Sequence, residues 1–228
     1  MKEKYIYILV LCISVGLFSG CELDNYDPPT SILQGSVVHE NEPVGVRSGG
    51  TRLELWQKGY ATPEKIDVFI SQEGTYSARL FDGEYKLVRV SGAPWQNDTD
   101  SVTVQVKGNT ILDVPVVPYY RISLPEDYLD LEDGTITTTC QVSKVGDRDI
   151  ESVTLYVGVT NLVDANNNAQ SQTLTGADLA DLSLPKVNSL VLNPQLQERQ
   201  YIYLRLGVKA IGIGERFYTP VIKINLPS

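Results

Sequence analysis

Segment 72–89 contains two Gly-x-Tyr units, in which Gly74 and Gly83 each stand two residues before a tyrosine that belongs to an alternating run. Asp82 and Gly83 separate the two runs, and both residue types tolerate the positive φ of a tight β-turn. Two short runs of period two on either side of such a turn predict a β-hairpin. We therefore expect a chain built from antiparallel strands, with this hairpin at its centre.

Short runs that alternate apolar and polar side chains recur about every ten residues over positions 32–118. In one of them, Leu53 and Leu55 are predicted to face inward and Trp56 outward. No long helical period interrupts these runs, and Pro118, which cannot donate to a sheet ladder, ends the series. The pattern predicts a β-sandwich of two antiparallel sheets over residues 32–118.

A second series of alternating runs occupies residues 119–228. Its inward-facing positions are apolar: Ile136, Cys140, Val142, Val153, Leu155, Val157, Ile202, Leu204, Leu206 and Val208. A polar insertion, segment 164–176, is expected to interrupt the strands, and only segment 177–182 hints at a helix. The length and pattern predict a second sandwich of immunoglobulin or fibronectin type III size, so the fold class is all-β, with two consecutive antiparallel β-sandwiches.

The N-terminus has the pattern of an export signal. Lys2 and Lys4 precede an apolar run, segment 5–18, which is shorter than the ~20 residues that span a bilayer. Small residues then precede Cys21 in a pattern that resembles a bacterial lipobox, which predicts a lipoprotein signal peptide over residues 1–20 and lipidation of Cys21. Acyl chains would hold the protein to a membrane, each buried methylene contributing ~0.8 kcal/mol. The alternative is an ordinary signal peptide with an incidental cysteine.

Residues 21–31 are polar and contain two adjacent prolines, which predicts a tether between the lipid and the first sandwich. Glu22, Asp24 and Asp27 follow Cys21 and resemble the acidic signal that sends lipoproteins of the Bacteroidetes to the outer face of the outer membrane. The predicted location is therefore the outer membrane, lipid-anchored and exposed at the cell surface. The alternative is that these carboxylates belong to a solvated linker.

The charge of the chain restricts its partners. The formal net charge is -9, and loss of residues 1–20, with two lysines and one glutamate, brings it to -10. An acidic surface repels phosphates, so nucleic acid is excluded as a partner.

Residues able to support catalysis are scarce. His39 is the only histidine, so the usual zinc sites and catalytic triads cannot be assembled from several histidines. After removal of the signal peptide and lipidation of Cys21, Cys140 is the one free thiol, and the alternation of its strand predicts that it is buried and structural. We therefore predict no enzymatic activity, no metal site and no cofactor.

Two tryptophans carry a binding hypothesis. Sugars present apolar faces edged by hydroxyls, so exposed aromatic rings beside amides and carboxylates suit them. Trp56 with Tyr60, and Trp95 with Gln96 and Asn97, have this composition and are candidate ligand-binding residues. The alternative is that the rings cap the sandwich or fill the domain interface.

The first sandwich also resembles a known fold family, the carboxypeptidase regulatory-like or transthyretin-like sandwich. The match lies in Gly-Ser-Val at 35–37 and in the two Gly-x-Tyr units at 74–76 and 83–85, which are nine residues apart. With a lipobox before it and a second sandwich after it, the chain resembles the two-domain Bacteroidetes lipoproteins of the DUF3823 family. That resemblance implies a place in Sus-type glycan-uptake systems, with a polysaccharide or oligosaccharide as ligand and outer-membrane transporter proteins as partners. It implies no catalytic residues.

Segment 100–106 carries two further hypotheses. Asp-Ser-Val at 100–102 resembles an O-glycosylation pattern of the Bacteroidetes, with Ser101 as the acceptor. The strand that begins there is a candidate exposed edge, which would suit binding of a protein by strand addition. The sequence therefore leaves two functions open: an accessory protein in glycan binding or uptake, or a scaffolding subunit of an outer-membrane transport complex that contacts no sugar.

Overall fold

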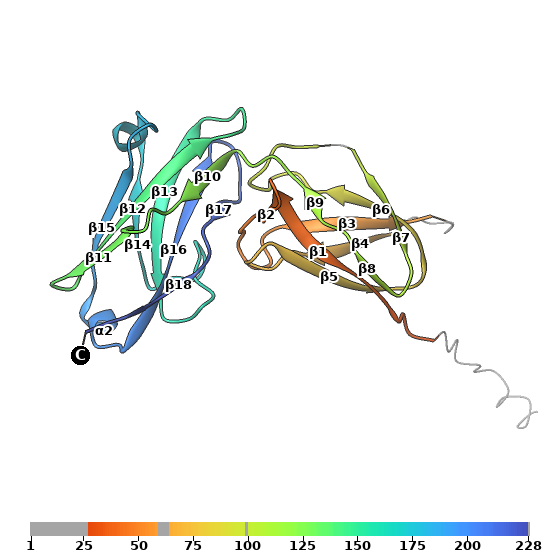
Figure 1. The fold of residues 1–228 in the computed structure, drawn as a ribbon, viewed down its shortest axis with the longest axis horizontal. Coiled ribbons are helices and arrows are strands. Elements are labelled where there is room, and N and C mark those ends of the chain that lie inside the picture. Colours follow the sequence, from red (N-terminus) through yellow and green to blue (C-terminus); the bar gives the residue numbers. More distant parts are fainter. Residues whose placement is uncertain (1–26, 59–63, 99, 228) are drawn as a thin grey trace, which may run out of the picture.

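The computed structural model describes residues 27–58, 64–98 and 100–227 and contains two β-sandwiches that lie side by side along the long axis of the molecule (Figure 1). Within these ranges the regular elements are strands apart from two helical turns of four residues each. The all-β fold with two consecutive β-sandwiches is therefore confirmed, except that one sheet of the first sandwich contains parallel as well as antiparallel pairs. No helix of the described residues is long and apolar enough to span a membrane.

The first sandwich packs a mixed sheet against an antiparallel sheet. Its strands are β1 (Ser31–His39), β2 (Glu42–Pro43), β3 (Arg52–Gln57), β4 (Lys65–Phe69), β5 (Thr75–Leu80), β6 (Gly83–Arg89), β7 (Val102–Val106), β8 (Asn109–Ile111) and β9 (Val114–Pro115). In the mixed sheet β1 pairs antiparallel with β2 and β5 and parallel with β8 and β9. The second sheet has the order β4-β3-β6-β7. Alternation buries Leu33, Leu55 and Leu87 between the sheets, which is the core that the pattern predicts.

The hairpin predicted around Asp82 and Gly83 is not formed. β5 pairs with β1, whereas β6 pairs with β3 and β7, so the chain crosses between the two sheets at this point. Asp82 does not have the positive φ that a two-residue hairpin turn requires. Its carboxylate instead accepts a hydrogen bond from the Ser31 hydroxyl at the start of β1. Both predicted strands exist, but each buries its apolar residues from a different side of the core.

The second sandwich repeats this two-layer plan. One sheet contains β10 (Tyr120–Ser123), β11 (Leu129–Glu132), β12 (Thr135–Lys144) and β15 (Lys186–Val191), and the other contains β13 (Ile150–Gly158), β14 (Gln170–Leu174), β16 (Tyr201–Ala210), β17 (Phe217–Tyr218) and β18 (Ile222–Asn225). The apolar positions predicted to face inward lie in one continuous core.

Two local predictions for the second sandwich need correction. The expected polar insertion contains β14, which pairs with β13 and ends its sheet, and this edge position explains why its residues are polar. The helical hint at 177–182 corresponds to a 3₁₀ turn, η1 (Gly176–Leu179). A further turn, α2 (Pro194–Gln197), begins at Asn193, whose side chain accepts a hydrogen bond from the Leu196 amide.

Backbone and side-chain contacts connect the two sandwiches. The Tyr218 amide donates to the Gly45 carbonyl at 2.9 Å. Arg205 of β16 donates from Nη2 to the Gln72 carbonyl of the first sandwich at 2.8 Å. Because the first sandwich covers this part of β16, Arg205 is fully buried although its side chain points away from the core of its own sandwich.

Candidate binding site

The structure places Trp56 on the outer face of β3. Its backbone register sets it between Lys65 of β4 and Lys86 of β6, and it is half-buried. Tyr60, which the sequence grouped with it, lies outside the described residues. Contact between a sugar and Trp56 therefore stays a prediction. The residues next to Trp56 on the two neighbouring strands are both lysines.

The exposed platform expected at Trp95 is not formed, because the ring is only 1% exposed. The chain that leads into the second sandwich covers it: Trp95 and Pro118 form an isolated antiparallel bridge, and hydrogen bonds join Gln96 to Val117 and Tyr119 to Pro94 on either side of it. This ring therefore packs into the core of the first sandwich beneath the linker, in agreement with the alternative that the ring caps the sandwich.

The polar neighbours of Trp95 remain accessible. Gln96 and Asn97 line a pocket of about 350 Å³ together with Arg89 and Asp98. A ligand bound by Gln96 and Asn97 would therefore lie next to the ion pair between Arg89 and Asp98 and would not contact the Trp95 ring.

Three other predicted residues have distinct outcomes. Ser101 is exposed just before β7, so its glycosylation stays a prediction. Cys21 lies outside the described residues. Cys140 is a fully buried free thiol, and burial raises its pKa to about 11, which agrees with a structural role and excludes a reactive thiolate.

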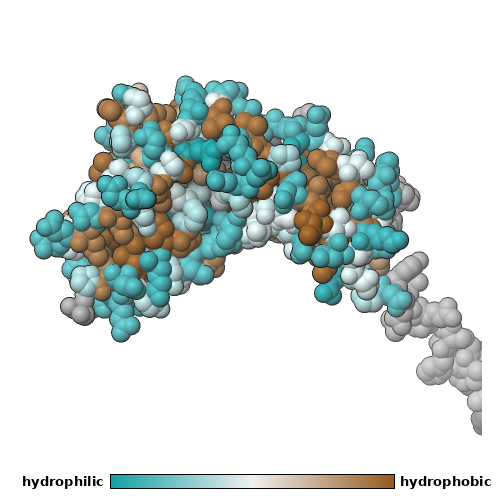
Figure 2. Space-filling model, in the orientation of Figure 1, coloured by the Kyte–Doolittle hydropathy of each residue, from teal (hydrophilic) through white to brown (hydrophobic). Residues whose placement is uncertain are grey.

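Apolar atoms are exposed on both sandwiches (Figure 2). On the first sandwich two of the most exposed large apolar side chains, Phe69 (57%) and Ile111 (71%), line the same groove. We call it the serine groove, a shallow concavity of about 720 Å³ lined by Gln34, Gly35, Ser36, Ser48, Gly49, Phe69, Ile70, Ser71, Thr75, Tyr76, Ser77, Ile111 and Asp113. Its volume is in the range of small-molecule sites.

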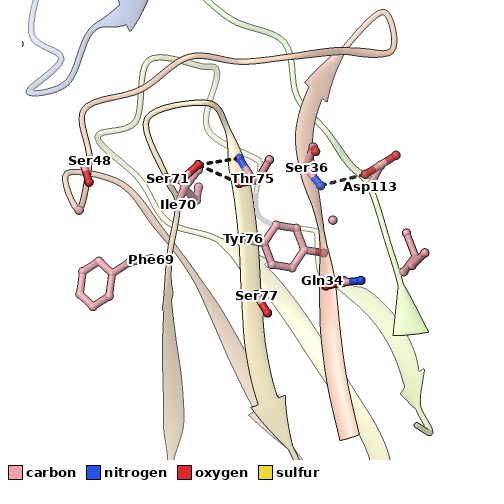
Figure 3. A pocket seen from close by; sticks show the side chains of 13 residues that line it. Gln34, Ser36, Ser48, Phe69, Ile70, Ser71, Thr75, Tyr76, Ser77 and Asp113 are labelled. Carbon is pink, nitrogen blue, oxygen red and sulfur yellow. Dashed lines mark hydrogen bonds between the residues drawn. The ribbon is translucent and has the colours of Figure 1, made fainter. Parts of the chain in front are cut away.

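The serine groove lies over the outer face of β1 and β5, where β4 turns into β5 (Figure 3). Strand register brings Gln34 opposite both Ser77 and Ile111, and Ser36 opposite Thr75. The outward positions of these strands therefore form a polar floor. Phe69, the last residue of β4, stands at the side of this floor in Figure 3.

Hydrogen bonds fix part of the floor. The Asp113 carboxylate accepts a hydrogen bond from the Ser36 amide at 2.8 Å, and the Ser71 and Thr75 hydroxyls lie 2.8 Å apart. The Tyr76 hydroxyl donates to the Leu112 carbonyl at 2.6 Å, and burial raises the pKa of Tyr76, so this phenol stays a neutral donor.

Other polar groups of the serine groove are available to a ligand. Within the described part of the chain, the side chains of Gln34, Ser48 and Ser77 make no hydrogen bond to another residue. An amide and two hydroxyls can each donate and accept. Combined with an exposed aromatic ring, these groups have the chemistry that a sugar needs.

Phe69 was missed as a site residue, although its signal was present. It lies between two buried residues, Val68 and Ile70, so strand alternation alone places its ring outside the core. A large aromatic residue at an outward position is the pattern that drew attention to Trp56. What the sequence lacked was the pairing that brings β4, β5 and β1 to one surface.

A second concavity of about 720 Å³, the interdomain groove, lies between the sandwiches. It is lined by Glu42, Pro43, Gly45, Gln72 and Glu73 of the first sandwich and by Arg121, Ile122, Asn161, Tyr203, Arg205, Phe217, Tyr218, Thr219, Pro220, Val221 and Lys223 of the second. Its charged groups already have partners: Arg121 pairs with Glu42 at 3.0 Å, and Lys223 lies 3.9 Å from the centre of the Tyr201 ring. Arg121 and Lys223 are thus engaged, whereas, among the described residues, the side chains of Gln34, Ser48 and Ser77 in the serine groove are not.

No cluster of three or more histidine, cysteine, aspartate or glutamate side chains that could hold a metal ion occurs among the described residues.

Family models match both sandwiches. The model described as "Protein of unknown function (DUF3823) N-terminal domain" matches residues 31–117, and the one described as "Domain of unknown function (DUF3823_C)" matches residues 120–223. No curated protein matches the sequence.

Solved structures match nearly the whole described chain. A DUF3823 family protein from Bacteroides ovatus is 33% identical, with a TM-score of 0.79 over 86% of this chain and 100% of that one. One from Parabacteroides merdae is 31% identical, with a TM-score of 0.79 over 87% and 100%. A candidate carbohydrate binding protein from Bacteroides uniformis is 21% identical, with a TM-score of 0.69 over 87% and 100%, which shows a shared fold.

Proposed function

The chain belongs to the DUF3823 family, and on that basis we propose that it is a non-enzymatic, lipid-anchored surface protein that binds glycans through the serine groove. The observation that carries this proposal is the exposed ring of Phe69 beside a floor of hydroxyl and amide groups. Aromatic rings stack on the apolar faces of sugars, while hydroxyls and amides bond their edges. The description of the Bacteroides uniformis protein as a candidate carbohydrate binding protein lends support from the same fold.

The first test is a binding screen of the mature chain, residues 21–228 with Cys21→Ser, against a panel of polysaccharides by affinity gel electrophoresis. We expect at least one polysaccharide to retard the protein. Phe69→Ala should weaken that retardation about fivefold or more, if a sugar stacked on one aromatic ring contributes on the order of the 1–3 kcal/mol known for a stacked nucleic-acid base.

Phe81→Ala is the matched control, since Phe81 is also an exposed phenylalanine of the first sandwich (44%) but does not line the serine groove. Its retardation should equal that of the parent protein. Equal loss in both variants, or no retardation by any polysaccharide, would overturn the proposal.

The anchor is part of the proposal. Cys21 would carry the acyl chains, residues 22–31 would connect them to the first sandwich, and the outer membrane would hold the protein beside a Sus-type transporter. Support comes from the lipobox-like sequence and the acidic residues that follow it. Metabolic labelling with a palmitate analogue tests it: label should enter the parent protein and not Cys21→Ala, and protease added to intact cells should digest the protein.

A second candidate function, scaffolding of a transport complex, is favoured by β7. This strand ends its sheet, so one of its sides is not paired with another strand of the described chain. An extended segment of a partner could add there. A photo-crosslinking residue at Gln105 of β7 should then trap one defined protein, whereas the same residue at Lys86 of the central strand β6 should not. A crosslink from Gln105 without glycan retardation would favour the scaffold.

A further inference from the structure

We infer that the serine groove selects uncharged glycans over glycans that carry carboxylates or sulfates. The inference rests on the proposed function and concerns the same groove. It follows from the charge, the hydrogen bonding and the shape of that surface.

Among the described residues that line the serine groove, Asp113 is the only charged side chain. This described lining contains no lysine, arginine or histidine. Proteins recognise carboxylates and sulfates with arginine and lysine, because charge-assisted hydrogen bonds neutralise the anion. An acidic sugar would find no such partner in this groove.

Asp113 is held in place to act on the ligand. Its Oδ1 accepts from the Ser36 amide at 2.8 Å, which fixes an exposed carboxylate at the edge of the polar floor. A carboxylate accepts hydrogen bonds from sugar hydroxyls and repels a second anion. At contact distance in a solvated site, that repulsion corresponds to a loss of about fivefold in affinity.

The other side chains of the serine groove can bind a ligand that carries no charge. Gln34, Ser48 and Ser77 offer neutral donors and acceptors, and Phe69 and Ile111 offer apolar surface. Sugar hydroxyls donate and accept in the same way, so a neutral glycan can satisfy every polar group of the floor.

The interdomain groove gives an internal contrast. Its lining includes Arg121, Arg205 and Lys223, so cationic side chains are present there and absent from the described lining of the serine groove. Binding of an acidic glycan that Phe69→Ala leaves unchanged would therefore belong to another surface and would not count as binding in the serine groove.

The test compares one glycan with its own charged form. The uncharged polysaccharide that gives the strongest retardation is oxidised at its primary alcohols, which converts them to carboxylates on the same backbone. We expect the oxidised form to bind the mature chain at least about fivefold more weakly. Binding of the uncharged form should be unchanged between low and high NaCl concentrations, since screening acts on charge pairs.

Two variants assign the effect to the groove. Asp113→Asn should recover part of the binding to the oxidised form, whereas Asp100→Asn, which removes the same charge from an exposed residue outside the groove, should not. Equal or stronger binding of the oxidised form, if Phe69→Ala abolishes it, would overturn the selectivity and keep the glycan-binding function. Retardation by acidic polysaccharides alone, again dependent on Phe69, would have the same meaning. Retardation by none would overturn the function itself.

Discussion

Arg205 holds a positive charge at a place where the described residues provide no carboxylate within ion-pair distance. Burial lowers its pKa to about 10. Its Nε donates to the Thr219 carbonyl at 2.7 Å, its Nη2 to the Gln72 carbonyl at 2.8 Å, and its guanidinium lies 4.5 Å from the centre of the Tyr218 ring. The planar fork of arginine thus serves one carbonyl of each sandwich, which the single nitrogen of lysine cannot reproduce.

We expect the titration of the buried Cys140 thiol to lower the free energy of unfolding measurably at alkaline pH. Burial raises the pKa of its thiol from 9.0 to about 11, so the unfolded chain releases this proton at lower pH than the folded chain does. The contribution of Cys140 to the free energy of unfolding is therefore present below pH 9 and is lost as the pH rises toward 11. Between pH 8 and pH 10 the loss should be about 1 kcal/mol.

Urea unfolding of the mature chain with Cys21→Ser, compared with the same chain carrying Cys140→Ala, measures this loss. The difference in unfolding free energy between the two proteins should become smaller from pH 8 to pH 10. A constant difference would show that the thiol titrates alike in both states.

Phe69 and Trp95 show which side-chain positions a single sequence can predict. Trp95 was expected to be exposed and is buried, whereas Phe69 was not singled out and is exposed. Alternation places Phe69 outside and is sufficient to expose its side chain. Trp95 lies in a loop with polar neighbours, and its burial depends on a bridge to Pro118 that no local pattern encodes. Burial by a distant segment is therefore the step that residue patterns could not give.

At the scale of elements, strands were predictable and their partners were not. The chain has Asp-Gly pairs at 82–83 and at 133–134, and both have the composition of a tight turn. In the second pair both residues have positive φ, 48° and 72°, and the turn joins β11 to β12 in a true hairpin. The first pair joins strands of opposite sheets. The two cases differ because β5 pairs with β1 and β6 pairs with β3 instead of with each other. These pairings depend on the tertiary structure and cannot be predicted from the turn sequence.

We expect position 35 of β1 to require glycine, because the backbone at Leu112, just after β8, lies against it. A Cβ there would lie 1.9 Å from the Leu112 carbonyl oxygen, which is backbone and cannot rotate away. Gly35→Ala should therefore force β1 from this segment and destabilise the fold by about 1–3 kcal/mol. Gly214→Ala is the control, since nothing lies within 4 Å of its Cβ position, and should change stability by less than about 0.5 kcal/mol. Equal unfolding midpoints in denaturant would contradict the requirement.

At the scale of the whole molecule, the interface makes the two sandwiches dependent on each other. An ion pair of 2.6 Å joins Arg47 to Glu215, and the Gln72 side chain donates to the Asn161 carbonyl at 3.1 Å. The bonds of Arg205 and Tyr218 also cross the interface, so all of these contacts would be lost if one sandwich unfolded alone. A hydrogen bond contributes about 0.5–1.5 kcal/mol net, so their joint loss disfavours separate unfolding.

We therefore expect the sandwiches to unfold in one transition, and the chain carries a probe for each. Both tryptophans, Trp56 and Trp95, lie in the first sandwich, and with Cys21→Ser the only thiol of the mature chain is Cys140 in the second. Tryptophan fluorescence and thiol reactivity should then report the same midpoint in urea. Arg205→Ala should separate the two midpoints, whereas Arg79→Ala, which removes an exposed arginine of β5, should not. Separate midpoints in the parent protein would mean that the interface contributes less than either core, because each sandwich would then be stable without the other.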